Sequence, residues 1–108
     1  MVNKAKQKGD REERRIVNLI KEWGFNAVRS PLSGAVQFRG QTDDIDAYFN
    51  GVEKAPFLIE CKMRKDNSGF KCIDEWMGNA DILSIRTNGN KAKYVLTEEA
   101  LKRLVLGV

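Results

Sequence analysis

The fold is decided by Asp44-Ile45-Asp46-Ala47-Tyr48-Phe49-Asn50-Gly51 and Phe57-Leu58-Ile59-Glu60-Cys61-Lys62, two stretches in which apolar and polar residues alternate. Alternate residues of a β-strand point to the same face of the sheet. We therefore predict two strands whose apolar residues, including Ile45, Ala47 and Ile59, face the core. The dipeptide Asn50-Gly51 is typical of hairpin turns and predicts that the two strands pair with each other.

The polar residues of these two strands share the opposite faces and form an acidic edge. Asp44 and Asp46 alternate along the first strand, and Glu60 and Lys62 lie about 7 Å apart along the second. Carboxylates on apolar strands repel each other and lose hydration, which favours a bound cation. Oxygen ligands in a chain without histidine suit Mg²⁺ or Mn²⁺ and argue against zinc. Lys62 is placed to orient a nucleophilic water or to neutralise charge on a phosphate.

Length and composition predict one soluble globular domain, residues 1–108. The absence of histidine removes the Ser-His and Cys-His nucleophile pairs. Cys61 and Cys72 are too few for a disulfide framework or a zinc site, so we expect reduced thiols. Because no long apolar run and no signal peptide is visible, we expect a cytoplasmic protein without membrane contact; a phage origin would be compatible with this.

An excess of basic residues indicates a polyanionic partner. The net charge is +4 and the pI is near 9.2. One basic cluster lies near the N-terminus, where we expect residues 1–8 to form a flexible arm, and another lies beside the acidic edge. The candidate nucleic-acid contacts from these clusters and from the loop before the first acidic strand are Lys8, Arg11, Arg14, Arg39, Arg64 and Lys65.

The first helix is predicted to begin at Asp10, as its cap, and to end at Gly24. Glu13 completes a capping box with Asp10. Helical periodicity places Glu13 at one edge of the apolar stripe and Glu12 at the other, and it does not choose between them as a functional acid. Both are equally well explained as capping or solvated acids.

The remaining elements complete an α/β domain. We predict a strand over 25–30, a loop over 32–42, the two acidic strands, a helix over 73–80, strands over 82–86 and 93–96, and a final helix capped by Thr97. Its apolar face would carry Leu101, Leu104 and Val105. The predicted fold is a central, mixed five-stranded sheet flanked by helices, in the order helix, three strands, helix, two strands, helix.

The order of several motifs along the chain adds a family resemblance. These motifs are Lys8-Gly9, Glu13-Arg14, Gly24-Phe25, Val28-Arg29-Ser30, Asp46 and Ile59-Glu60-Cys61-Lys62. Together they resemble the archaeal-type Holliday junction resolvases of the PD-(D/E)XK nuclease superfamily. Their order is much more specific than the Glu-x-Lys triplet, which alone is common in unrelated proteins.

The resemblance implies a PD-(D/E)XK nuclease-like fold and specific roles for several residues. Glu13 would be the acid carried by the helix, Asp46 and Glu60 the central metal ligands, and Lys62 the catalytic lysine. Arg29 and Ser30 would lie near the scissile phosphate. The resemblance also implies a homodimer that depends on Mg²⁺, with Mn²⁺ able to substitute, and that nicks branched DNA such as four-way junctions during recombination and repair.

Three points stay open at this level. Asp46 is chosen as the ligand because it lies inside the predicted strand, and Asp44 is held in reserve. Either Ser30 or Ser33 would approach the site. Finally, a small nuclease acting on duplex or flapped DNA, or an inactive DNA-binding module, are alternatives to the resolvase, although the intact set of Asp46, Glu60 and Lys62 argues against the inactive module.

Overall fold

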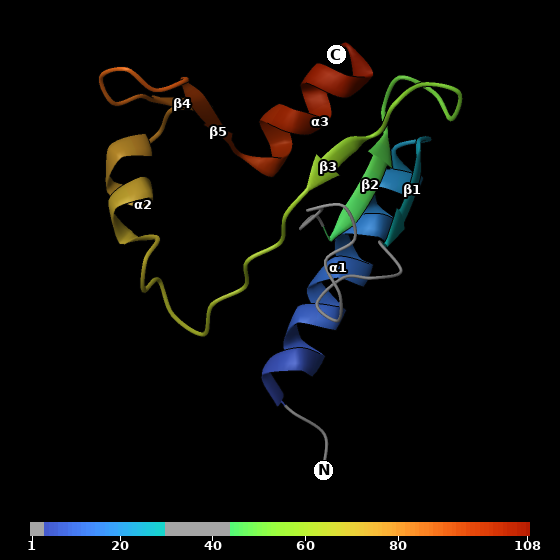
Figure 1. The fold of residues 1–108 in the computed structure, drawn as a ribbon, viewed down its shortest axis with the longest axis horizontal. Coiled ribbons are helices and arrows are strands. Elements are labelled where there is room, and N and C mark those ends of the chain that lie inside the picture. Colours follow the sequence, from blue (N-terminus) through green and yellow to red (C-terminus); the bar gives the residue numbers. More distant parts are fainter. Residues whose placement is uncertain (1–3, 30–43) are drawn as a thin grey trace. The chain divides into compact units, whose positions relative to one another are not determined.

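The computed structural model describes residues 4–29 and 44–108, with the backbone alone for residues 4–8. In these residues the predicted order of helices and strands is confirmed (Figure 1). The elements are α1 (Lys4–Glu22), β1 (Asn26–Arg29), β2 (Ile45–Tyr48), β3 (Phe57–Ile59), α2 (Lys71–Met77), β4 (Ile82–Ile85), β5 (Lys93–Leu96) and α3 (Glu98–Leu106). They fall into two compact units, Met1–Met63 and Arg64–Val108.

The first unit consists of an antiparallel sheet in the order β1-β2-β3, with α1 packed on β1 and β2 (Figure 1). Its register sets Ala27 opposite Ala47, and Ile45 opposite Ile59. Ile20 of α1 and Ile45 of β2 are both almost completely buried. The predicted alternation is therefore confirmed in β2, where Ile45 and Ala47 face the helix and the core.

The second unit contains the β4–β5 hairpin, with α2 packed on β4 and α3 packed on β5. The predicted cap of α3 is confirmed, because the side chain of Thr97 accepts a hydrogen bond from the backbone N–H of Ala100 at 3.1 Å. At the other end, Gly107 has a φ of 71°, a left-handed conformation that glycine adopts without strain. Leu104, predicted to belong to the apolar face of this helix, is instead exposed.

Several predicted boundaries are wrong, for identifiable reasons. The helix α1 begins at Lys4 and thus includes part of the expected arm, because Asp10 does not cap it but binds Arg29 of β1. The strand β3 ends at Ile59, where the N–H of Cys61 turns to a carboxylate instead of a backbone carbonyl. The connection between β2 and β3 spans residues 49–56, too long for the tight turn predicted at Asn50-Gly51.

The predicted five-stranded mixed sheet is not shown. Within the described ranges the strands form a three-stranded and a two-stranded sheet, and all of their pairs are antiparallel. Hydrophobic patterns specify which residues of a strand are buried, but they do not specify which strands pair or in which direction. The mixed α/β character is thus confirmed, whereas a single central sheet is not.

Candidate active site

Glu13 is the one buried charged residue within the part of the chain that the structure describes, with 8% of its surface exposed. It lies on the face of α1 that packs against the sheet, four residues before the core residue Val17. A buried carboxylate requires a cationic or hydrogen-bonding partner to offset its lost hydration. Arg29 supplies that partner, because its Nε donates to Glu13 Oε1 at 3.0 Å.

Arg29 also binds a second carboxylate on the same helix. One of its terminal nitrogens donates to Asp10 Oδ1 at 2.8 Å, so the guanidinium bridges two acids that are one helical turn apart. Burial lowers the pKa of Arg29, but the hydrogen bonds and charges of Glu13 and Asp10 outweigh it and raise the pKa above its ordinary value. The Asp10–Arg29–Glu13 cluster therefore holds the charged guanidinium of Arg29 between α1 and β1. The Asp10 contact spans 19 residues of sequence, and no local pattern predicts it.

Glu12 lies in a different environment from Glu13. Arg15 binds its two carboxylate oxygens at 2.8 and 3.1 Å, one turn further along the helix surface. The hydrogen bond from Arg15 lowers the pKa of Glu12. The geometry therefore directs Glu13 toward the sheet and Glu12 into a surface ion pair, a distinction that helical periodicity left open.

Asp44 is hydrogen-bonded on both sides of Glu60. Its backbone N–H donates to the carbonyl of Ile59 at 2.9 Å, and its Oδ2 accepts from the N–H of Cys61 at 2.7 Å. The Asp44 carboxylate thus takes the place of a backbone partner at the point where β3 ends. These two bonds hold Asp44 against the residues directly before and after Glu60.

Asp46, the ligand chosen from the sequence, occupies a different position. The register pairs it with Val28 on one side and Leu58 on the other, and both of these apolar side chains are about half exposed. Cross-strand neighbours share a face, so Asp46 lies on the sheet surface that points away from α1. The assignment of Asp46 as a metal ligand stays a prediction. Asp44, and not Asp46, is hydrogen-bonded to the residues on either side of Glu60.

Glu60 and Lys62 lie next to each other, as their spacing predicts. Lys62 Nζ is 3.3 Å from Glu60 Oε1, and both side chains are substantially exposed. An exposed pair of this kind contributes about 0–1 kcal/mol to stability. The pair therefore contributes little to stability, but it presents a carboxylate and an ammonium group side by side on the surface.

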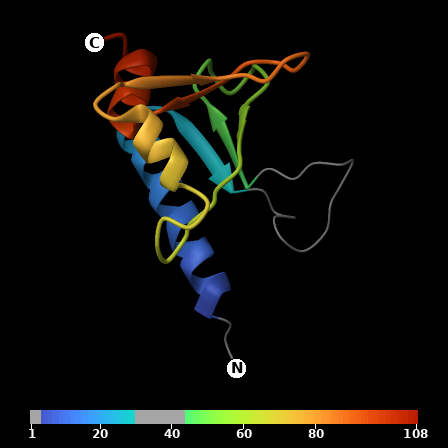
Figure 2. The ribbon, with the colours of Figure 1, turned by 90° about the vertical axis from the view of Figure 1, so that its left-hand side faces the viewer.

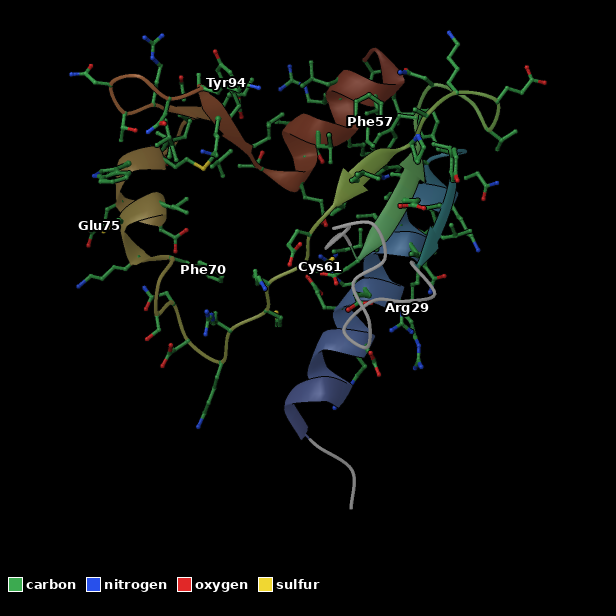
Figure 3. The ribbon with its side chains drawn as sticks, viewed as in Figure 1. Arg29, Phe57, Cys61, Phe70, Glu75 and Tyr94 are labelled. Carbon is green, nitrogen blue, oxygen red and sulfur yellow. The ribbon has the colours of Figure 1, made fainter. Side chains whose placement is uncertain are left out.

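The pKa of the Cys61 thiol reflects the acidic side chains around it. Burial, followed by the negative charges of Asp44, Glu13, Glu12 and Glu60, raises the pKa of the Cys61 thiol to about 12. Figure 3 shows Cys61 and Arg29 at the same end of the three-stranded sheet. The N-terminal half of α1 extends beyond this end. Acids from α1, from the start of β2 and from the end of β3 therefore contribute to one negative potential.

This potential makes a direct prediction about thiol reactivity. Cys61 should react with iodoacetamide at pH 8 about tenfold more slowly than Cys72, or slower still, because only the thiolate is nucleophilic and Cys61 holds its proton and is half-buried. Peptide mass analysis of protein alkylated over time would measure both rates, with urea-unfolded protein as the control. Equal rates in the folded protein would contradict the acidic environment.

The carboxylates do not form a complete metal cage. In residues 9–29 and 44–108, no three Cys, Asp or Glu side chains come together closely enough to hold an ion. A magnesium site does not need three, because Mg²⁺ keeps several waters and commonly binds one or two carboxylates together with substrate phosphates. Asp44 and Glu60 fit this description, whereas Glu13 is engaged with Arg29.

The predicted DNA contacts are only partly described. Arg11 and Arg14 are exposed on α1, and Arg64 and Lys65 are exposed where the second unit begins. Only the backbone of Lys8 is described, within α1. Ser30, Ser33 and Arg39 lie outside the described residues.

A comparison of the sequence with protein families returns one family across most of the chain. Residues 4–98 match the family described as archaeal Holliday junction resolvase (hjc). The chain belongs to the archaeal Holliday junction resolvase family. The match begins with α1 and continues through β5. It therefore extends beyond Lys62, the last residue of the motifs noted in the sequence, and covers parts of both compact units.

Membership of the resolvase family sets the functional class. The chain is a nuclease of the Holliday junction resolvase type, with the DNA binding and the role in recombination that this implies. A comparison with solved structures finds none that matches the chain. Among the described residues of this resolvase, no helix is long and apolar enough to span a membrane.

Proposed function

We propose that this protein is a Mg²⁺-dependent, structure-selective endonuclease that hydrolyses phosphodiester bonds in four-way and other branched DNA. The observation that carries the proposal is the pair of hydrogen bonds that joins Asp44 to Ile59 and Cys61, the residues before and after Glu60. The negative charges of Asp44, Glu60 and Glu13 all act on Cys61 at this point. A negative potential on a basic protein attracts a cation to one place and leaves the remaining surface for phosphates.

The residues of the site divide into two roles. Asp44 and Glu60 would hold the metal ion, with Asp46 as the alternative to Asp44. A bound Mg²⁺ would polarise the scissile phosphate and lower the pKa of an attacking water. Lys62, beside Glu60, orients that water, and its ammonium neutralises charge that develops on the phosphate.

Arg29 and Glu13 act at the other side of this site. Arg29 carries a charge that does not titrate, on the strand next to β2, where it can bind a phosphate oxygen of the substrate. Glu13 holds Arg29 in place while DNA is absent. If Arg29 shifts toward a phosphate, Glu13 becomes available to the metal, which would couple DNA binding to completion of the ligand set.

The substrate and the assembly can be tested together. Resolution of a four-way junction requires two nicks related by approximate two-fold symmetry, so one site per chain implies a C2 homodimer. We expect light scattering to give a dimer mass, and Mg²⁺ or Mn²⁺ to support paired, symmetric cleavage of a four-way junction in preference to flap or linear DNA of equal length.

The outcomes separate the candidate functions. If the protein is a monomer that cuts flap, linear and four-way DNA equally well, it is a nuclease without selectivity for branched DNA. A protein that binds junctions without cutting them in either metal would be an inactive DNA-binding module.

A further inference from the structure

The β4–β5 hairpin carries the features of a second DNA contact, made by residues other than those of the acidic site and the basic residues predicted around it. Residues 82–96 contain no aspartate or glutamate but include Arg86, Lys91 and Lys93, all exposed. Across the described ranges, none of these three forms an ion pair. The hairpin is therefore a purely cationic element in a chain whose charges are otherwise mixed.

The cationic side chains lie on both faces of the ribbon. Ser84 pairs directly with Tyr94, and Ile85 pairs with Lys93. Because alternate residues share a face, Arg86 follows Ser84 onto the face of Tyr94, whereas Lys93 lies on the face of Ile85. A ribbon with positive charge on both faces matches a groove that has a phosphate backbone along each wall, and the DNA major groove is wide enough for a two-stranded ribbon.

The tip of the hairpin is a closed turn. The backbone N–H of Asn90 donates to the carbonyl of Thr87 at 3.1 Å, and its side-chain amide donates to Thr87 Oγ1 at 2.6 Å. Gly89 supplies the positive φ, 77°, that the turn requires. Figure 2 shows this tip extending beyond α2 and α3 of its own unit. A stiff, projecting element loses little conformational entropy when it binds.

An exposed aromatic ring adds to the charge pattern. Tyr94 is 63% exposed and has only the small Ser84 directly opposite it (Figure 3). Tyrosine side chains are among the groups that contact the phosphates and sugars of duplex DNA, beside the cations that bind phosphates. The combination favours DNA over a partner that is recognised by charge alone.

We propose that the β4–β5 hairpin enters a groove of one duplex arm of the substrate, with Arg86 and Lys93 on opposite phosphate backbones and Lys91 near the tip. This inference rests on the proposed function and adds a contact surface in the second unit. The contacts are to phosphates, so they increase affinity for every arm equally and read no base sequence.

The test is the salt dependence of DNA binding by the full-length protein. Arg86→Gln/Lys91→Gln/Lys93→Gln should weaken junction binding at least about tenfold and reduce the slope of log K against log salt by about 2–3, near 0.9 for each lost phosphate contact. The matched control is Lys21→Gln/Lys54→Gln/Lys71→Gln, which removes the same charge from exposed positions outside the hairpin. The control should change the slope by less than about 1.

Single replacement at the tip guards against a folding defect in the triple variant. Lys91→Gln should reduce the slope by about 1 with an unchanged melting temperature. If the hairpin variants have the same affinity and the same salt slope as the control, the inference is wrong. Junction cleavage by the wild type would still support the proposed function. A hairpin variant that changes the mass in light scattering but keeps the salt slope would also overturn the inference, by making this surface a protein interface. Wild-type protein that neither binds nor cuts DNA would remove the proposed function itself.

Discussion

Asp44→Asn should lower Mg²⁺-dependent cleavage of a four-way junction at least about hundredfold while junction binding stays within about threefold of wild type. Asparagine keeps an oxygen that can accept from the N–H of Cys61, so the local structure survives. What it removes is the charge that we propose binds the metal. Glu60→Gln should behave in the same way. Single-turnover cleavage and a binding titration, both on the same DNA, measure the two effects separately.

Asp46→Asn is the comparison that distinguishes the two aspartates. If Asp44 is the ligand, Asp46→Asn should retain cleavage within about tenfold of wild type, because the register sets Asp46 opposite Val28 and Leu58, whereas Asp44 is bonded to the residues on both sides of Glu60. Loss of cleavage in Asp46→Asn with near-normal cleavage in Asp44→Asn would reverse the assignment and restore the choice made from sequence. Near-normal cleavage in all three variants would remove the site.

Metal binding should also be visible without catalysis. At a hundredfold excess over its dissociation constant, Mg²⁺ should stabilise the wild type by about 2.7 kcal/mol. Asp44→Asn should raise stability in chelator, since it removes one member of a set of mutually repelling acids, and it should abolish most of the response to Mg²⁺. Identical melting curves of the wild type in chelator and in Mg²⁺ would contradict a metal site.

Arg29→Ala should lower the free energy of unfolding by about 2–3 kcal/mol. The substitution leaves Glu13 buried without its cation and leaves Asp10 nearby, and removal of one partner from a largely buried pair costs more than the pair contributes. Adding Glu13→Gln to Arg29→Ala should recover about 1 kcal/mol or more, because a neutral amide tolerates burial better than a charge. Urea denaturation of the two single variants and the double variant measures this coupling.

Arg15→Ala is the matched control for Arg29→Ala. It also breaks an Arg–Glu pair that involves α1, but that pair lies on the helix surface, with 51% of the Arg15 side chain exposed. The cost should be below about 1 kcal/mol. Equal losses in the two variants, or no recovery in the double variant, would show that the Asp10–Arg29–Glu13 cluster carries no special energy.

Much of the fold could be predicted because it depends on local patterns. The alternation around Ile45 and Ala47 was sufficient to identify β2 and its buried face. The Thr97 cap gave the start of α3. The start of α1 was misplaced because Asp10 looks like a cap, while its actual partner is 19 residues away. Patterns within a segment contain no information about a side chain that arrives from another strand.

The sequence by itself determined the order of elements, the family, and the residue types of an acidic, histidine-free site, because periodicity, motif order and composition are all properties of the linear chain. Helical periodicity could not choose between Glu13 and Glu12, and only the family resemblance favoured Glu13; the tertiary structure buries Glu13, because Arg29 arrives from β1 to bind it. It likewise placed Asp44 beside Glu60, because strand register and the end of β3 arise from pairing between segments. Alternation gave Asp44 and Asp46 the same face, and the hydrogen bonds from Asp44 to Ile59 and from Cys61 to Asp44 are what separate them.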